Sequence, residues 1–197
     1  MTTGTQAQSG SRLNLGFAGG VTDLVLAGMF AALVAFLGST PLPSPDAILR
    51  PFAMGVLYAT PGIIGLIGTY GRRRSLLIGA ALPLFPGAIL SWSGVTLLFL
   101  VPAGLLLAAA AVAPASSAPR ALGLGAIRST VVAGLILAAG WAALFGFTEQ
   151  RCVFISGGTS CSSAAVTVEG TLVAVSCLAL AVALAAWTVR TGRDSLG

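Results

Sequence analysis

GIIGLIGTYGRRRSLLIGAALPLF, residues 62–85, is the stretch that decides the fold of this chain. Three consecutive arginines, Arg72, Arg73 and Arg74, separate two apolar runs. Residues 62–85 contain no other charged residue. A soluble domain usually has about a quarter of its residues charged, whereas 8% of this chain is charged and 56% is hydrophobic. The composition therefore predicts an integral membrane protein, and the arginine triplet predicts one end of a transmembrane helix pair.

The remaining apolar runs predict how often the chain crosses the membrane. A helix needs about 20 apolar residues to cross the hydrocarbon layer. The sequence predicts an all-α, polytopic transmembrane bundle of six helices, over residues 20–37, 51–70, 75–90, 93–113, 127–147 and 165–189. The transmembrane domain covers 15–190, between a polar N-terminal tail at 1–14 and a C-terminal tail at 191–197. The first apolar run is too long for the core of a cleavable signal peptide, so we expect it to remain as a helix.

The arginines predict the orientation. The uncharged stretch from Ser75 to Ala113 could form one over-long helix, or two helices joined near residues 91–93. Two helices gather most arginines on one side, which is the cytoplasmic side by the positive-inside rule, and they place both termini there. That side then holds Arg12, Arg72, Arg73, Arg74, Arg120, Arg128, Arg190 and Arg193, and the opposite side holds Arg50 and Arg151. The expected location is the plasma (inner) membrane of a bacterium.

The third predicted helix, residues 75–90, is short and contains Pro83 and Pro86. It could be a helix that ends early in a Pro-Gly turn. It could instead be re-entrant, because irregular backbone at membrane depth is tolerated where protein buries it or where it lines a water-filled cavity. In the second case a site would lie near 83–87, and both alternatives stay open on the sequence alone.

Two cysteines lie in the longest polar segment, from Thr148 to Glu169, which joins the last two predicted helices. The charge pattern places Cys152 and Cys161 outside the cytoplasm, where thiols oxidise, so we predict a disulfide between them. A metal site is a poor alternative because the chain has no histidine and two thiolates do not complete a tetrahedral zinc site. Cys177, inside the last helix, is expected to pack as a small hydrophobic residue.

Small residues predict where helices approach each other closely. The second predicted helix carries a glycine at every third position, namely Gly62, Gly65, Gly68 and Gly71. In lipid, such positions let helix backbones come together, so these glycines are predicted helix-packing residues. The first helix has Ala27, Ala31 and Ala35 at intervals of four, which form a second face of small residues.

Groups that could perform chemistry are scarce. Ionisable residues inside a membrane usually indicate an ion or substrate pathway, but Asp23 is expected at the cytoplasmic end of the first helix, within reach of Arg12. Glu169 precedes the last helix, and both carboxylates are expected to interact favourably with a helix N-terminus. The chain lacks histidine, lysine and the phosphate-binding and dinucleotide-binding motifs. We therefore predict that it is not an enzyme and has no catalytic residue, cofactor or metal site.

Two functions remain. The first is a helix-packing subunit or an envelope-associated interaction protein, whose partners are the lipid bilayer and either another membrane protein or a second copy. Nucleic acid is not an expected partner, because the arginines lie at the edges of apolar segments as topology signals do. The helix count and the Ala27, Ala31 and Ala35 spacing resemble the substrate-binding subunits of energy-coupling-factor vitamin transporters. This resemblance implies the alternative function, a membrane transport component that binds a small neutral or apolar solute.

Overall fold

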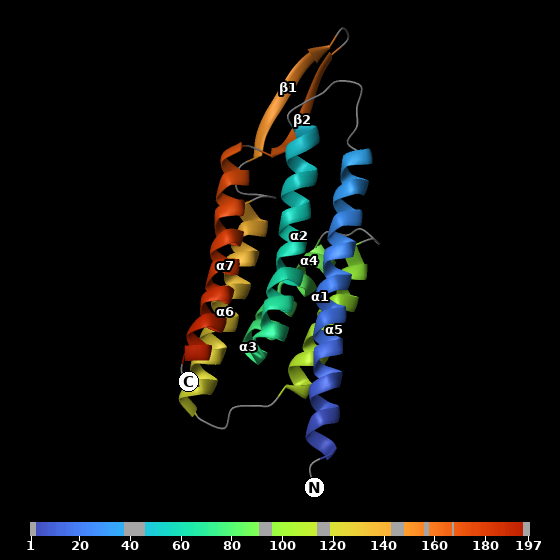
Figure 1. Ribbon diagram of the computed structural model, residues 1–197. Coiled ribbons are helices and arrows are strands. Elements are labelled where there is room, and N and C mark those ends of the chain that lie inside the picture. The colour runs from blue at the N-terminus through green and yellow to red at the C-terminus, as the bar shows by residue number, and fades with distance from the viewer. Residues whose placement is uncertain are drawn as a thin grey trace.

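The computed structural model describes residues 3–37, 46–90, 96–113, 119–142, 148–155, 158–166 and 168–194. These residues form seven α-helices, one short 3-10 helix and two strands (Figure 1). The elements, in chain order, are α1 (Thr3–Leu37), α2 (Asp46–Tyr70), α3 (Arg74–Ala81), α4 (Leu84–Leu90), η1 (Thr96–Phe99), α5 (Leu100–Val112), α6 (Pro119–Trp141), β1 (Thr148–Ile155), β2 (Gly158–Val166) and α7 (Val168–Asp194).

Four of these helices are long and apolar enough to cross a membrane. Their candidate spans are Leu13–Phe36, Pro51–Tyr70, Gly123–Trp141 and Gly170–Arg190, within α1, α2, α6 and α7. Large apolar side chains such as Met29, Ile127 and Leu172 lie exposed on the outside of these helices, as a lipid environment requires. The architecture thus fits the predicted membrane protein, with four of the six predicted spans at full length.

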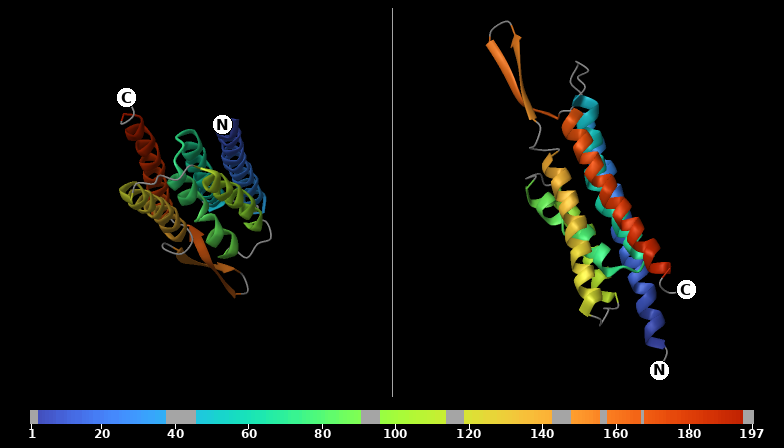
Figure 2. Two further views of the ribbon diagram at one scale, coloured as in Figure 1. Left: turned by 90° about the horizontal axis from the view of Figure 1, so that it is seen from below. Right: turned by 90° about the vertical axis from the view of Figure 1, so that its left-hand side faces the viewer.

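The other two predicted spans are shorter than a full membrane crossing, as the sequence already indicated for residues 75–90. The apolar helices Arg74–Ile89 and Thr96–Val112 have at most 17 residues, and 17 helical residues extend only about 26 Å, less than a hydrocarbon layer of about 30 Å. Figures 1 and 2 show that α4 ends before it reaches the end of α1 and α2 nearest the strands. The α3–α4 and η1–α5 segments therefore form a pair of short apolar helices beside the four long ones, and both alternatives for residues 75–90 stay open.

The proline residues explain why the third segment is not one helix. Proline has no N–H and its ring clashes with the carbonyl group four residues earlier, so helices break or kink there. The structure has a turn at Leu82 and Pro83, between α3 and α4. One helical hydrogen bond ends at this turn, from Leu82 N to Ile78 O (3.0 Å), and another begins at it, from Gly87 N to Pro83 O (3.2 Å).

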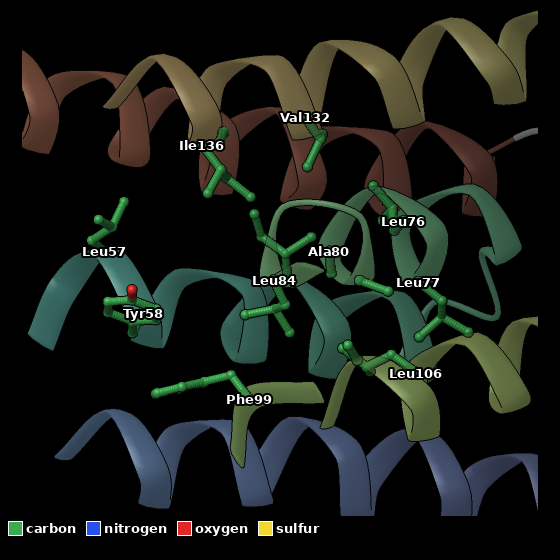
Figure 3. Packing of buried hydrophobic residues seen from close by; sticks show 14 of the residues in the cluster. Leu57, Tyr58, Leu76, Leu77, Ala80, Leu84, Phe99, Leu106, Val132 and Ile136 are labelled. Atoms are coloured by element: carbon green, nitrogen blue, oxygen red, sulfur yellow. The ribbon is translucent and has the colours of Figure 1, made fainter. Parts of the chain in front are cut away.

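The α2 helix is the centre of the bundle. It contacts α1, α3, α5, α6 and α7, and half of its candidate span is buried, against 22% to 28% for the other three spans. The α2 helix, α3, α4, η1, α5 and α6 contribute the large side chains of the core, which Figure 3 shows packed together. The labelled ones are Leu57, Tyr58, Leu76, Leu77, Ala80, Leu84, Phe99, Leu106, Val132 and Ile136. Asp23 lies on α1, which packs closely on α2 and α5.

The polar segment before α7 is a two-stranded antiparallel hairpin, whereas the sequence predicted a loop in an all-α protein. The hairpin projects beyond one end of the helical bundle, as Figure 2 shows, and the N-terminal end of α1 and the C-terminal end of α7 lie toward the other end (Figure 1). The α1 helix begins at Thr3, so the segment predicted as a polar tail continues the first helix.

Candidate functional site

Asp23 is the residue whose position differs most from the sequence prediction. The sequence placed it at the cytoplasmic end of the first helix, but α1 begins at Thr3 and Asp23 lies near the middle of the span Leu13–Phe36. Pairing with Arg12 is also wrong, since eleven residues along a helix separate the two Cα atoms by about 16 Å. Asp23 is fully buried, and neither of its carboxyl oxygens has a hydrogen-bond partner within the described part of the chain.

The carboxyl group of Asp23 lies against the backbone of α2 at Gly62. A Cβ atom added to Gly62 would lie 2.9 Å from Asp23 Oδ2 and 2.8 Å from the carbonyl oxygen of Gly20. On the other side of the contact, a Cβ atom added to Gly20 would lie 3.0 Å from the carbonyl oxygen of Gly62. Two glycines thus let α1 and α2 close over the carboxyl group, and no side chain at position 62 separates them.

The α5 helix and η1 also pack against α1. On one side of Asp23 along α1, Gly19 lies against Leu105 and Leu106, and on the other side the ring of Phe30 lies 6.3 Å from that of Phe99. Asp23 lies between Gly19 and Phe30 along α1, and Pro102 and Ala103 of α5 are fully buried. The α5 sequence, LVPAGLLLAAAAV, contains no polar side chain that could bind the carboxyl group.

The energetic cost of this arrangement is substantial. An aspartate at the centre of a membrane helix costs about 2.5–3.5 kcal/mol on insertion scales, and such residues usually pair with another group or mark a transport pathway. Across the four candidate spans and the two shorter apolar helices, Asp23 is the sole acidic residue. No side chain of the described residues compensates for this cost, and the polar group that faces the carboxyl group is the backbone of Gly62. The carboxyl group is therefore the strongest candidate functional group among the described residues.

The four glycines of the predicted stripe contact four different elements. Gly62 lies against α1, Gly65 against Leu106 of α5, Gly68 against Leu76 and Leu77 of α3, and Gly71 against Val189 of α7. A glycine at every third position drifts around a helix with 3.6 residues per turn. The stripe therefore winds around α2 and meets four of its neighbouring helices in turn. Gly62 is the glycine of the stripe that lies against the carboxyl group of Asp23.

The region near Pro83–Gly87, where the sequence left a second site open, is supported by hydrogen bonds from α2 and η1. The last carbonyl groups of a helix have no partner within it, and here Tyr58 Oη donates to Gly87 O (3.4 Å) and Thr96 Oγ1 donates to Ala88 O (3.2 Å). The ring of Tyr58 also packs on the rings of Phe30 (5.1 Å) and Phe99 (4.6 Å). These contacts hold the last turn of α4, residues 87–90, which we call the α4 tip, against α2 and η1. The α4 tip therefore has a structural role in the fold.

The arginine triplet forms the turn between α2 and α3. Arg73 N donates to Gly68 O (2.8 Å) and Arg72 N donates to Thr69 O (3.2 Å), which is the hydrogen-bond pattern of a Schellman motif. Arg72 has φ 52° at the position where such motifs usually have glycine, and its side chain and that of Arg74 are exposed. The turn lies at the same end of the bundle as the C-terminal end of α7 (Figure 1).

The hairpin places the two loop cysteines opposite each other. Cys152 of β1 is the register partner of Cys161 of β2. Directly opposed residues of antiparallel strands have Cα atoms about 4.5–5.5 Å apart, which overlaps the range of disulfides. The disulfide stays a prediction, because the side chains of residues 143–169 lie outside those that the structure describes. Cys177 is a half-buried free thiol on α7.

The chain matches no protein-family model, no curated protein and no solved structure. The resemblance to energy-coupling-factor substrate-binding subunits therefore depends on the helix count and on three alanines. Of these, Ala27 is buried, Ala31 lies against Gly55 of α2, and Ala35 is exposed, so they do not share one environment. The function must be inferred from the site itself.

The sequence did contain a signal for the depth of Asp23. Leu13, Leu15 and Phe17 precede the glycine pair Gly19 and Gly20, and a span counted from Leu13 places Asp23 near its middle. The prediction began the span at Gly20 instead, which moved the aspartate to the edge. No sequence pattern indicated that the carboxyl group of Asp23 would lack a hydrogen-bond partner, because this depends on which residues of the neighbouring helices face it.

Proposed function

We propose that this protein is a membrane transport component that binds a small solute between α1, α2 and α5, at the carboxyl group of Asp23. The observation that carries the proposal is a fully buried carboxyl group near the middle of a span, with neither oxygen hydrogen-bonded. Buried ionisable groups of this kind usually mark substrate or ion pathways. The proposed location stays the plasma membrane, with the arginine-rich end inside.

The chemistry of the site changes the expected solute class. The sequence suggested a neutral or apolar solute because no ionisable group was expected near the membrane centre. A carboxyl group without a donor favours a solute that presents a hydrogen-bond donor or a positive charge. The described conformation has α1 and α2 closed over Asp23, so binding requires the two helices to separate at Gly20 and Gly62.

A thermal-shift screen of the purified protein in detergent tests this proposal. A ligand at 100 times its dissociation constant stabilises the folded state by about 2.7 kcal/mol, so binding appears as a raised melting temperature. The panel should contain small amines, polyols and neutral metabolites, applied to the wild type, Asp23→Asn and Asp194→Asn. Asp194 is the last residue of α7 and lies beyond the candidate span, which makes its variant the matched control.

The expected result is a solute that raises the melting temperature of the wild type and of Asp194→Asn but leaves Asp23→Asn unchanged. If no compound of the panel shifts the wild type, or if the shift survives in Asp23→Asn, the proposed transport site is wrong.

A specific observation favours the second function, a helix-packing subunit. Gly28 of α1, Gly104 of α5 and Gly134 of α6 are exposed glycines, and a Cβ atom added to any of them would meet no atom within 4 Å. Such positions leave room for the close approach of a partner helix. Purification in a mild detergent tests this proposal: a stoichiometric partner or a stable homo-oligomer that Gly104→Leu disrupts supports it, and a monodisperse monomer counts against it.

A further inference from the structure

The helices around Asp23 offer it no charge. On α1 the other ionisable side chain is that of Arg12, about three helical turns away. On α2 the titratable or charged residues are Asp46 and Arg50 in its first turns, Tyr58 one turn from Gly62, and Tyr70 at its last residue. Tyr58 Oη donates to Gly87 O, and α5 contains no titratable residue. These helices therefore place no charged side chain beside the carboxyl group among the described residues, and the backbone of α2 at Gly62 lies against it.

An ionised carboxylate does not fit such an enclosure. The isolated charge would lose its hydration without gaining a donor, and a group in this position becomes neutral instead. A metal ion is a poor counter-charge, because the described residues contain no group of three or more carboxylate or thiol ligands. The smallest cation that satisfies the site without moving α1 or α2 is a proton on one of the two carboxyl oxygens.

We propose that Asp23 is a proton-binding site at the centre of the membrane, protonated when α1 and α2 are closed and able to release its proton when they separate. In the closed state the group is a neutral carboxylic acid. When the contact between Gly20 and Gly62 opens, water reaches Oδ2, accepts the proton as hydronium and hydrates the carboxylate that remains. The proton site itself does not depend on solute binding, whereas its use in coupling rests on the proposed transport function.

With such a site, α1 and α2 close only when Asp23 carries a proton. A proton and a cationic solute would compete for the same two oxygens, so each can be bound only when the other has left. The solute class is then a small amine or another cation, and its uptake would be exchanged for a proton. The adjacent glycine pair is suited to such a cycle, since it lets the helices meet without interlocking side chains.

Infrared spectroscopy of the protein in lipid tests the proton site directly. A protonated carboxylic acid has a carbonyl band that is distinct from the bands of a carboxylate. Exposed aspartates are ionised at about pH 7 because their ordinary pKa is about 3.9. The expected result at that pH is an acid band in the wild type that shifts when aspartate is labelled with ¹³C and is absent from Asp23→Asn.

The isotope label keeps the test decisive if Asp23→Asn does not fold, because the shift is read in the wild type. The other two aspartates, Asp46 and Asp194, lie outside the candidate spans and should contribute no acid band. The proposal is overturned if the wild type has no ¹³C-sensitive acid band at about pH 7, or if the band is unchanged in folded Asp23→Asn.

The two proposals can fail separately. An acid band without any stabilising solute leaves the proton site standing and counts against transport. The opposite outcome is a solute that stabilises the wild type but not Asp23→Asn, in a protein that shows no acid band. That result supports the transport site and overturns the proton-binding site, because Asp23 is then an ionised partner for a cationic solute.

Discussion

Polar groups are buried among apolar helices at the α4 tip and at Asp23, but side-chain donors in the described part of the chain satisfy them only at the α4 tip. At the α4 tip, Tyr58 and Thr96 donate to the carbonyl oxygens of Gly87 and Ala88, so the broken helix is supported by its neighbours. Where α1 packs on α2, no hydrogen-bond partner for the carboxyl oxygens of Asp23 is found among the residues that the structure describes. The fold thus provides donors where irregular backbone needs them, and the missing donor at Asp23 points to a function rather than to poor packing.

Among the substitutions considered, Gly62→Ala should lower the free energy of unfolding the most. Gly62→Ala places a methyl group 2.8 Å from Gly20 O and 2.9 Å from Asp23 Oδ2, so α1 and α2 must move apart. We expect the free energy of unfolding in detergent to fall by about 2–3 kcal/mol, as for overpacked cores. The matched control is Gly104→Ala, where no atom lies within 4 Å. Equal free energies for the two variants would show that α1 and α2 do not close over Asp23.

The stability that depends on Asp23 should change with pH, whereas the hydrogen bonds to Gly87 O and Ala88 O should not make stability depend on pH. If the closed state holds a proton that the unfolded chain lacks above about pH 4, wild-type stability falls as pH rises, by up to about 1.4 kcal/mol per pH unit. Asp23→Asn has no proton to lose there and should not show this slope. Thermal melts from about pH 5 to about pH 9 measure the difference. A slope that is the same in both proteins contradicts a proton held at Asp23.

A smaller effect is expected at the α4 tip. Thr96→Val removes the donor to Ala88 O and should lower the free energy of unfolding by about 1 kcal/mol, independently of pH. Thr130→Val is the control, because Thr130 is exposed on α6. Chemical unfolding of both variants in the same detergent measures the difference. If Thr96→Val is as stable as Thr130→Val, the α4 tip does not depend on this donor.

The smallest effect is expected for Tyr58→Phe. This change keeps the ring contacts with Phe30 and Phe99 but removes the donor to Gly87 O, whose hydrogen bond is long at 3.4 Å. We expect a loss of about 0.5 kcal/mol in the same unfolding assay. A loss as large as that of Gly62→Ala would mean that the tip, rather than the α1–α2 contact, is the more sensitive region.

The sequence was informative where a property depends on local composition. The apolar runs around Pro51–Tyr70 and Gly170–Arg190 predicted spans that the structure has. The prolines at 83 and 86 marked the third segment as irregular, and a re-entrant form was one of its two interpretations. Hydrophobicity summed over about 20 residues is a strong signal because each exposed backbone polar group costs several kcal/mol in lipid, which compels helix formation.

Composition and apolar run length were enough to predict a helical membrane protein with few ionisable groups, and four long apolar helices of the structure fit that prediction. The packing of α1 on α2 is what buries Asp23 near the middle of a span with no hydrogen-bond partner among the described residues, and Gly62 makes room for it. The physical reason is that solvation of a carboxyl group depends on its neighbours in space. Those neighbours come from α2 and α5, far along the chain, and no local pattern specifies how the three helices meet.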